Sequence, residues 1–134
     1  MARLALLLAV AGVAIVVASG ANATTRPRPI QFGRSGGNGP QWAVSIKSGG
    51  SVIIASSGGG TRHRKITVAQ VRKLDREIQR AHLAKKRICA GSNPDFTSQY
   101  IKFGGHKFVL RGSCEPKFTR VWNDLAPLAG QLAK

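Results

Sequence analysis

The side chains that could carry out catalysis are few and scattered in this chain. Asp75 and Glu77 stand two residues apart in a helical pattern, so their carboxylates point apart and cannot act on each other as general acid and base. No histidine has another histidine, a cysteine or an acid at the spacing of a zinc finger or a His-Glu-x-x-His helix. The sequence therefore predicts no enzyme, no cofactor and no metal site. A metal site assembled in space from the three histidines, His63, His82 and His106, is the remaining alternative.

A glycine-rich stretch, "FGRSGGNG" from Phe32 to Gly39, is the second place where chemistry could occur. A phosphate-binding P-loop requires Gly-Lys-Ser/Thr at its end, and no lysine follows here. A dinucleotide-binding turn leads straight into a helix, whereas this stretch leads into Pro40 and a strand pattern. The stretch is then a turn between strands or a loop that contacts another protein.

Basic residues gather in two runs, and the chain has a formal net charge of +16. Such a charge attracts anionic partners over a long range and is screened by salt. The sequence therefore predicts a polyanion-binding or cell-envelope-binding surface, the alternative being a basic face that only keeps the protein soluble. No RNP, KH or zinc-finger signature points to specific nucleic-acid binding. The predicted polyanion-binding residues are Arg62, His63, Arg64, Lys65, Lys85, Lys86 and Arg87.

The first 23 residues have the pattern of a secretory signal peptide. One basic residue precedes an apolar run from Leu4 to Ala18, and Ala21-Asn22-Ala23 is a small-x-small cleavage site. An uncleaved membrane anchor is the alternative, but the apolar run is shorter than the roughly 18 to 20 residues that span a bilayer. We expect a secreted protein cleaved near Ala23, with residues 24–29 as a flexible lead-in and residues 30–134 as one domain.

Two cysteines, Cys89 and Cys114, remain after the expected cleavage. In an oxidising compartment they are expected to form one disulfide, with two buried thiols as the alternative. Closing a loop of this length would stabilise the fold by roughly 3 to 4 kcal/mol on the chain-entropy model.

Strand and helix patterns follow each other along the rest of the chain. Residues 42–47 and 51–56 predict one hairpin and residues 96–103 and 106–111 a second, each joined by two glycines. A capping box at Thr67 and Gln70 opens a helix expected to run to about Ala84, and a second helix is expected from Pro116 to about Ala126. The predicted fold class is α+β: a small antiparallel sheet of hairpins with two helices packed on one face and one disulfide.

The order of these parts resembles the emfourin family of protease inhibitors. The resemblance covers nearly all of the chain after residue 29, and exported relatives look similar in placing cysteines where Cys89 and Cys114 stand. The matching segments are "IQFGRSGG" (Ile30 to Gly37), "ITVAQVRKLDREI" (Ile66 to Ile78), "NPDFTSQYIKF" (Asn93 to Phe103) and "FTRVWNDLAPL" (Phe118 to Leu128).

The resemblance implies a secreted, non-enzymatic protein that inhibits an extracellular, thermolysin-like metallopeptidase by presenting loops to its active-site cleft. Backbone without side chains can approach such a cleft closely. Where similar proteins carry an apolar residue after Ser-Gly-Gly, this chain has Asn38 and Gly39, so an apolar anchor is missing from that position. The implied contact loop consists of Ser35, Gly36, Gly37, Asn38 and Gly39.

Overall fold

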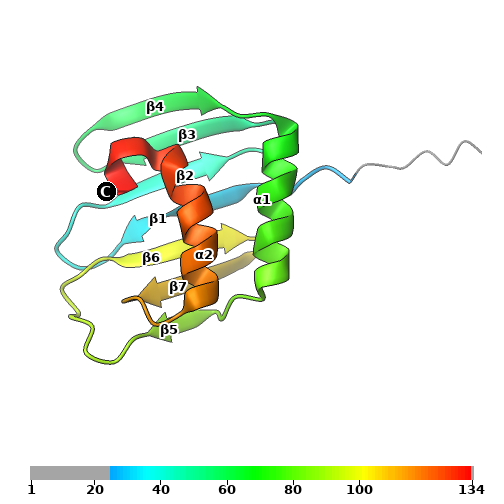
Figure 1. The fold of residues 1–134 in the computed structure, drawn as a ribbon. Coiled ribbons are helices and arrows are strands. Elements are labelled where there is room, and N and C mark those ends of the chain that lie inside the picture. Colours follow the sequence, from blue (N-terminus) through cyan, green and yellow to red (C-terminus); the bar gives the residue numbers. More distant parts are fainter. Residues whose placement is uncertain (1–24, 134) are drawn as a thin grey trace, which may run out of the picture.

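The chain forms seven strands, most of them with alternating apolar and polar residues, and the two amphipathic patterns form helices (Figure 1). The computed structural model describes residues 25–133; the expected signal peptide lies outside them. No helix in this range is long and apolar enough to cross a membrane. The elements are β1 (Ile30–Ser35), β2 (Trp42–Ile46), β3 (Ser51–Ser56), β4 (Gly60–Lys65), α1 (Val68–Ala81), β5 (Lys86–Ile88), β6 (Ser98–Phe103), β7 (His106–Arg111), α2 (Pro116–Leu125) and the 3₁₀ segment η1 (Ala126–Ala133).

The strands form one sheet in the order β4-β3-β2-β1-β6-β7-β5, with β1 at its centre. Both predicted hairpins are confirmed, as β2–β3 and β6–β7. The predicted antiparallel sheet of hairpins is present, and one parallel pair, β5 with β7, adds to it at one edge. A parallel pair requires a long crossover, and this sheet meets that requirement because β5 precedes β7 by the whole β6 strand and its flanking loops.

The two edge strands lie where the sequence patterns indicate no strand. Residues 60–65 carry no apolar side chain, so they look like a basic loop, yet all six pair with β3. Helix α1 ends at Ala81 instead of about Ala84, because His82 takes a left-handed conformation with φ of 47°. The basic run that follows then forms the short edge strand β5.

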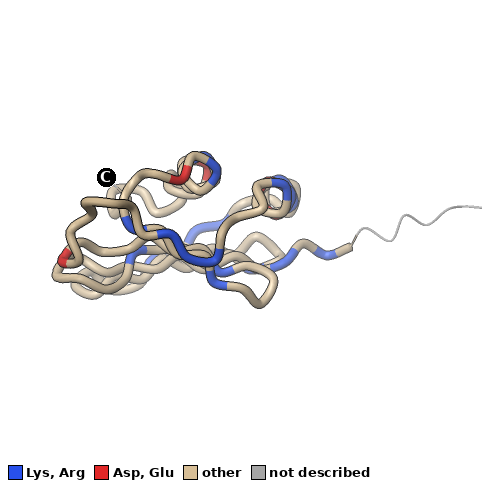
Figure 2. Tube along the Cα trace, turned by 90° about the horizontal axis from the view of Figure 1, so that it is seen from below, with Lys and Arg blue, Asp and Glu red and all other residues tan. Residues whose placement is uncertain are grey.

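Both helices pack on one face of the sheet, as predicted, which makes the fold α+β (Figures 1 and 2). The capping box of α1 is present, with the backbone N–H of Gln70 donating to the hydroxyl of Thr67. Rings of Phe32, Trp42, Phe118 and Trp122 meet at centroid distances of 5.7 to 6.1 Å between sheet and α2. The opposite face of the sheet, here called the open face, has no helix over it.

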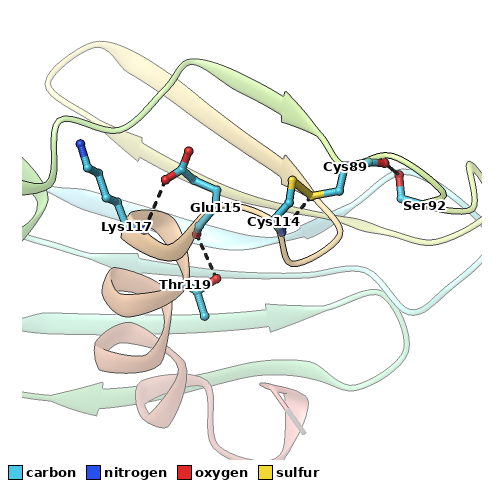
Figure 3. Close-up of a disulfide and its surroundings, with 6 residues drawn as sticks. All are labelled: Cys89, Ser92, Cys114, Glu115, Lys117 and Thr119. Carbon is cyan, nitrogen blue, oxygen red and sulfur yellow. Dashed lines mark hydrogen bonds between the residues drawn. A yellow bond between two sulfur atoms is a disulfide. The ribbon is translucent and has the colours of Figure 1, made fainter.

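Cys89 and Cys114 form the predicted disulfide (Figure 3). Cys89 directly follows β5 and Cys114 directly precedes Glu115, the residue that caps α2. The bridge therefore encloses the β6–β7 hairpin and ties the short β5 edge to the start of α2. Gly112 is required beside it: its φ is 95°, and a Cβ there would lie 2.6 Å from the Cβ of Cys89.

Residues 25–29, the predicted lead-in, contain no helix or strand but contact the domain. Pro27 is buried, and the backbone N–H of Arg28 donates to the Asp75 carboxylate on α1 at 2.9 Å. The guanidinium of Arg28 lies 4.8 Å from the ring centroid of Phe103 on β6. The lead-in is thereby connected to both the helix layer and the sheet.

Candidate functional site

The predicted contact loop leaves the sheet at the end of β1 and is held from one side. Gly36 and Gly37 have φ of 75° and 61°, a region that favours glycine. The backbone N–H of Asn38 donates to the carbonyl oxygen of Asp95 at 2.8 Å. A Cβ on Gly37 would lie 2.4 Å from that same oxygen. The close approach of the two backbones thus depends on glycine at 37 and fixes the loop against residues 93–97.

Phe96 is the apolar side chain next to this loop, and it is 65% exposed. The sequence pattern predicted it as the first residue of a strand, but β6 begins only at Ser98. Phe96 instead closes a turn in which its N–H donates to the Asn93 carbonyl at 3.1 Å and the Asn93 side chain accepts from the N–H of Asp95 at 2.9 Å. Asn-Pro-Asp, a strong turn signal, could have indicated that the strand starts later. We call residues 35–39 and 93–97 together the loop end.

A wide groove lies at the opposite end of β1 and has a volume of about 600 Å³. Three separate segments form it: the lead-in, the end of β2 and the β6–β7 hairpin. Its basic side chains all lie exposed. They are Arg28, Lys47, Lys102, His106 and Lys107. We call this feature the basic groove; the sequence motifs did not indicate it, because its residues are isolated along the chain.

The two basic runs singled out from the sequence do not meet in space. Arg62, His63, Arg64 and Lys65 lie on β4, and Lys86 and Arg87 on β5, with Lys85 just before it; these strands are the two opposite edges of the sheet. Residues within β4 also alternate between faces, since Arg62 and Arg64 stand opposite the buried Ile54 and Val52 and therefore lie on the helix side. The runs thus form two separate basic edges.

The fold brings together two acids that lie far apart in the sequence, Glu77 on α1 and Asp124 on α2. Burial raises the pKa of Glu77 above its ordinary 4.5, and the hydrogen bond and like charge of Asp124 raise this pKa further. Lys73 opposes the rise through an ion pair with a Nζ to Oε1 distance of 3.6 Å. The pair lies between the helices, away from the loop end and the basic groove.

Tyr100 and Phe103 lie on opposite faces of β6, as their spacing predicts. Both rings are buried, and both are covered by cations. The Nζ atoms of Lys102 and Lys107 lie 5.9 and 5.1 Å from the Tyr100 centroid, and the guanidinium of Arg28 lies over the Phe103 ring. Burial raises the pKa of Tyr100 above its ordinary 10.0, so its hydroxyl stays neutral at physiological pH.

The histidines are not brought into a common site. Within residues 25–133, no group of three or more His, Cys, Asp or Glu side chains could hold a metal ion. Comparison with known proteins adds no assignment, because no protein-family model and no curated protein match this chain. The loop end, the basic groove and the two basic edges are therefore the features that bear on function.

Proposed function

We propose that this protein is a secreted, non-enzymatic, emfourin-like inhibitor that binds a thermolysin-like extracellular metallopeptidase through its loop end. The order of strands and helices and the segments quoted above support the resemblance. A disulfide in a domain of this size fits an oxidising, extracellular location.

The observation that carries the proposal is the placement of Phe96 beside the glycine loop. The sequence lacks an apolar anchor at Asn38 and Gly39, and Phe96 supplies one from the neighbouring segment. The side chain is mostly exposed in the free protein, so a partner could bury it. Full burial of a phenylalanine contributes roughly 1.5 to 3 kcal/mol, the size of an interface hot spot.

The rigidity of the loop end also supports the proposed inhibition. The loop end is held by the Asn38–Asp95 hydrogen bond, by the turn at Asn93 and by the nearby disulfide. A loop already fixed in one conformation loses little entropy when it binds. A fixed loop also resists the backbone changes that a peptidase needs in order to cleave it. These properties favour an inhibitor over a substrate.

The proposal is tested by measuring inhibition constants against several thermolysin-type peptidases with the secreted, disulfide-bonded protein. We expect inhibition at micromolar concentration or below for at least one of them. Phe96→Ala should raise that constant at least tenfold while changing stability by less than about 0.5 kcal/mol, since the side chain is mostly exposed.

Ile88→Ala is the matched control, because Ile88 is also an exposed apolar residue, at 52%, but lies on β5. It should leave the inhibition constant within twofold. An absence of inhibition by the unchanged protein at micromolar excess over every peptidase tested would refute the proposed function. Equal effects of both substitutions would refute the role of Phe96.

A further inference from the structure

The basic groove combines a hollow shape with one sign of charge. Arg28 contributes from the lead-in, Lys47 from the β2–β3 turn, and Lys102 and Lys107 from facing positions of the β6–β7 hairpin. The hairpin turn keeps the groove open on this side: Gly104 has φ of 56°, and a Cβ on it would lie 2.9 Å from a guanidinium nitrogen of Arg28. Four permanent cations therefore surround one depression.

Among residues 25–133, no carboxylate forms an ion pair with these cations. The groove lining contains no Asp or Glu, and the one ion pair found within residues 25–133 joins Lys73 and Glu77 on α1. Four of the five acids lie on the helices or at the cap of α2, and the fifth, Asp95, lies in the β5–β6 loop at the loop end, whereas Lys and Arg occur in both layers (Figure 2). Like charges held close together raise the local positive potential and attract an anionic ligand.

The aromatic rings near the groove restrict the kind of anion. Nucleic-acid grooves of this type use exposed ring faces on which bases stack. Here Phe103 is 6% and Tyr100 7% exposed, and cations cover both rings. Among the groove residues only the exposed ring of His106 could then stack on a base, whereas carboxylate or sulfate groups need only the cations and neutral donors such as Gln31 and Ser45, which also line the groove.

We infer that the basic groove binds a linear acidic polysaccharide, with Arg28, Lys47, Lys102 and Lys107 contacting its carboxylate or sulfate groups. The basic side chains of the groove are exposed to solvent, so they can reach charged groups along a polymer. This function does not depend on peptidase inhibition, because the groove and the loop end lie at opposite ends of β1.

The test uses a short heparin oligosaccharide as the probe and isothermal titration calorimetry on the secreted, disulfide-bonded protein. Lys102→Gln with Lys107→Gln should weaken binding at least tenfold and reduce its salt dependence. Arg62→Gln with Lys65→Gln removes the same charge from the β4 edge and should weaken binding less than twofold. Both pairs are exposed, so the melting temperatures should stay close to that of the unchanged protein.

Two results would overturn the inference. Equal weakening by the two double variants would show that only the overall charge attracts the probe. Tighter binding of a single-stranded DNA of equal charge would show that the groove selects nucleic acid. Should Lys102→Gln with Lys107→Gln lower the melting temperature, Lys47→Gln, in the β2–β3 turn, provides the same comparison and should weaken binding at least threefold.

Discussion

The two ends of β1 differ in the backbone and side chains that they expose. At the loop end, paired glycines expose backbone, and one phenylalanine protrudes. At the basic groove, side chains from three segments converge, and charge dominates. Contacts of the first kind depend on shape and on apolar area, so salt should affect them little. Contacts of the second kind should weaken steeply with salt. The proposed inhibition and the proposed polysaccharide binding would thus occupy opposite ends of one central strand.

The restraints at the two ends differ as well. The disulfide and the Asn38–Asp95 hydrogen bond hold the loop end, whereas Asp75 holds the lead-in that forms one wall of the groove. Removing one restraint should therefore damage one end more than the other.

Replacing both cysteines, Cys89→Ser with Cys114→Ser, should lower the free energy of unfolding by about 3 kcal/mol on the chain-entropy model. Hydrogen exchange should increase most in β5 and residues 89–97, next to the lost bridge. Inhibition should weaken while heparin binding stays within twofold. Denaturant titration and exchange mass spectrometry measure these effects. Uniform loss of protection across the sheet would contradict a restraint confined to the loop end.

Gly37→Ala should lower stability by about 2 kcal/mol, because an L residue is strained at φ of 61° and the added Cβ would meet the Asp95 carbonyl. Gly36→Ala is the matched control: its φ is 75°, but no atom lies within 4 Å of the added Cβ. We expect a loss of about 1 kcal/mol there. Thermal denaturation separates the two. Equal losses would mean that contact with Asp95 is unimportant for the loop end.

Asp75→Ala should lower stability by about 1.5 kcal/mol, because the Arg28 N–H and the Gln79 side-chain amide lose their acceptor. Heparin binding should weaken as the groove wall loosens. Asp75→Asn removes the same charge but keeps an acceptor oxygen, so it should recover at least half of each loss. Inhibition should stay unchanged in both variants. Unchanged heparin binding by Asp75→Ala would show that the position of the lead-in does not depend on its hydrogen bond to α1.

Glu77→Gln should change the free energy of unfolding least, and it should leave both binding activities unchanged because the residue lies at neither end of β1. The raised pKa means that the folded protein holds this proton more tightly than the unfolded chain. Stability from this group therefore falls as pH rises from about 4.5 through the raised pKa and is constant above it. Glu77→Gln should raise stability at pH 7 by at most about 0.5 kcal/mol and by nothing near pH 4. Denaturant titrations at both pH values measure this difference. A gain in stability only at pH 4 would contradict a raised pKa of Glu77.

Sequence patterns predicted the two hairpins and both helices, because local turn chemistry and apolar spacing determine them. The disulfide followed from the two cysteines that remain after the expected signal peptide. They missed β4, whose residues bear no apolar side chain and pair only because β3 presents a free edge. They also missed β5, a three-residue strand. Neither strand carries a local signal strong enough to outweigh its basic, loop-like composition.

The candidate sites also differ in whether a local sequence pattern indicates them. The glycine loop could be found from the sequence because its glycines are consecutive. Phe96 was assigned to a strand, and its exposure depends on where β6 begins. The basic groove joins residues as distant as Arg28 and Lys107, so only the strand order brings them together.

The basic β4 strand also affects how the protein behaves when many copies are crowded together. An edge strand of six exposed residues presents backbone groups that a second sheet could pair with. Three permanent positive charges, on Arg62, Arg64 and Lys65, would face the same three charges of a neighbouring copy. The resulting repulsion should keep concentrated solutions free of fibrils at low ionic strength, and high salt should remove that protection.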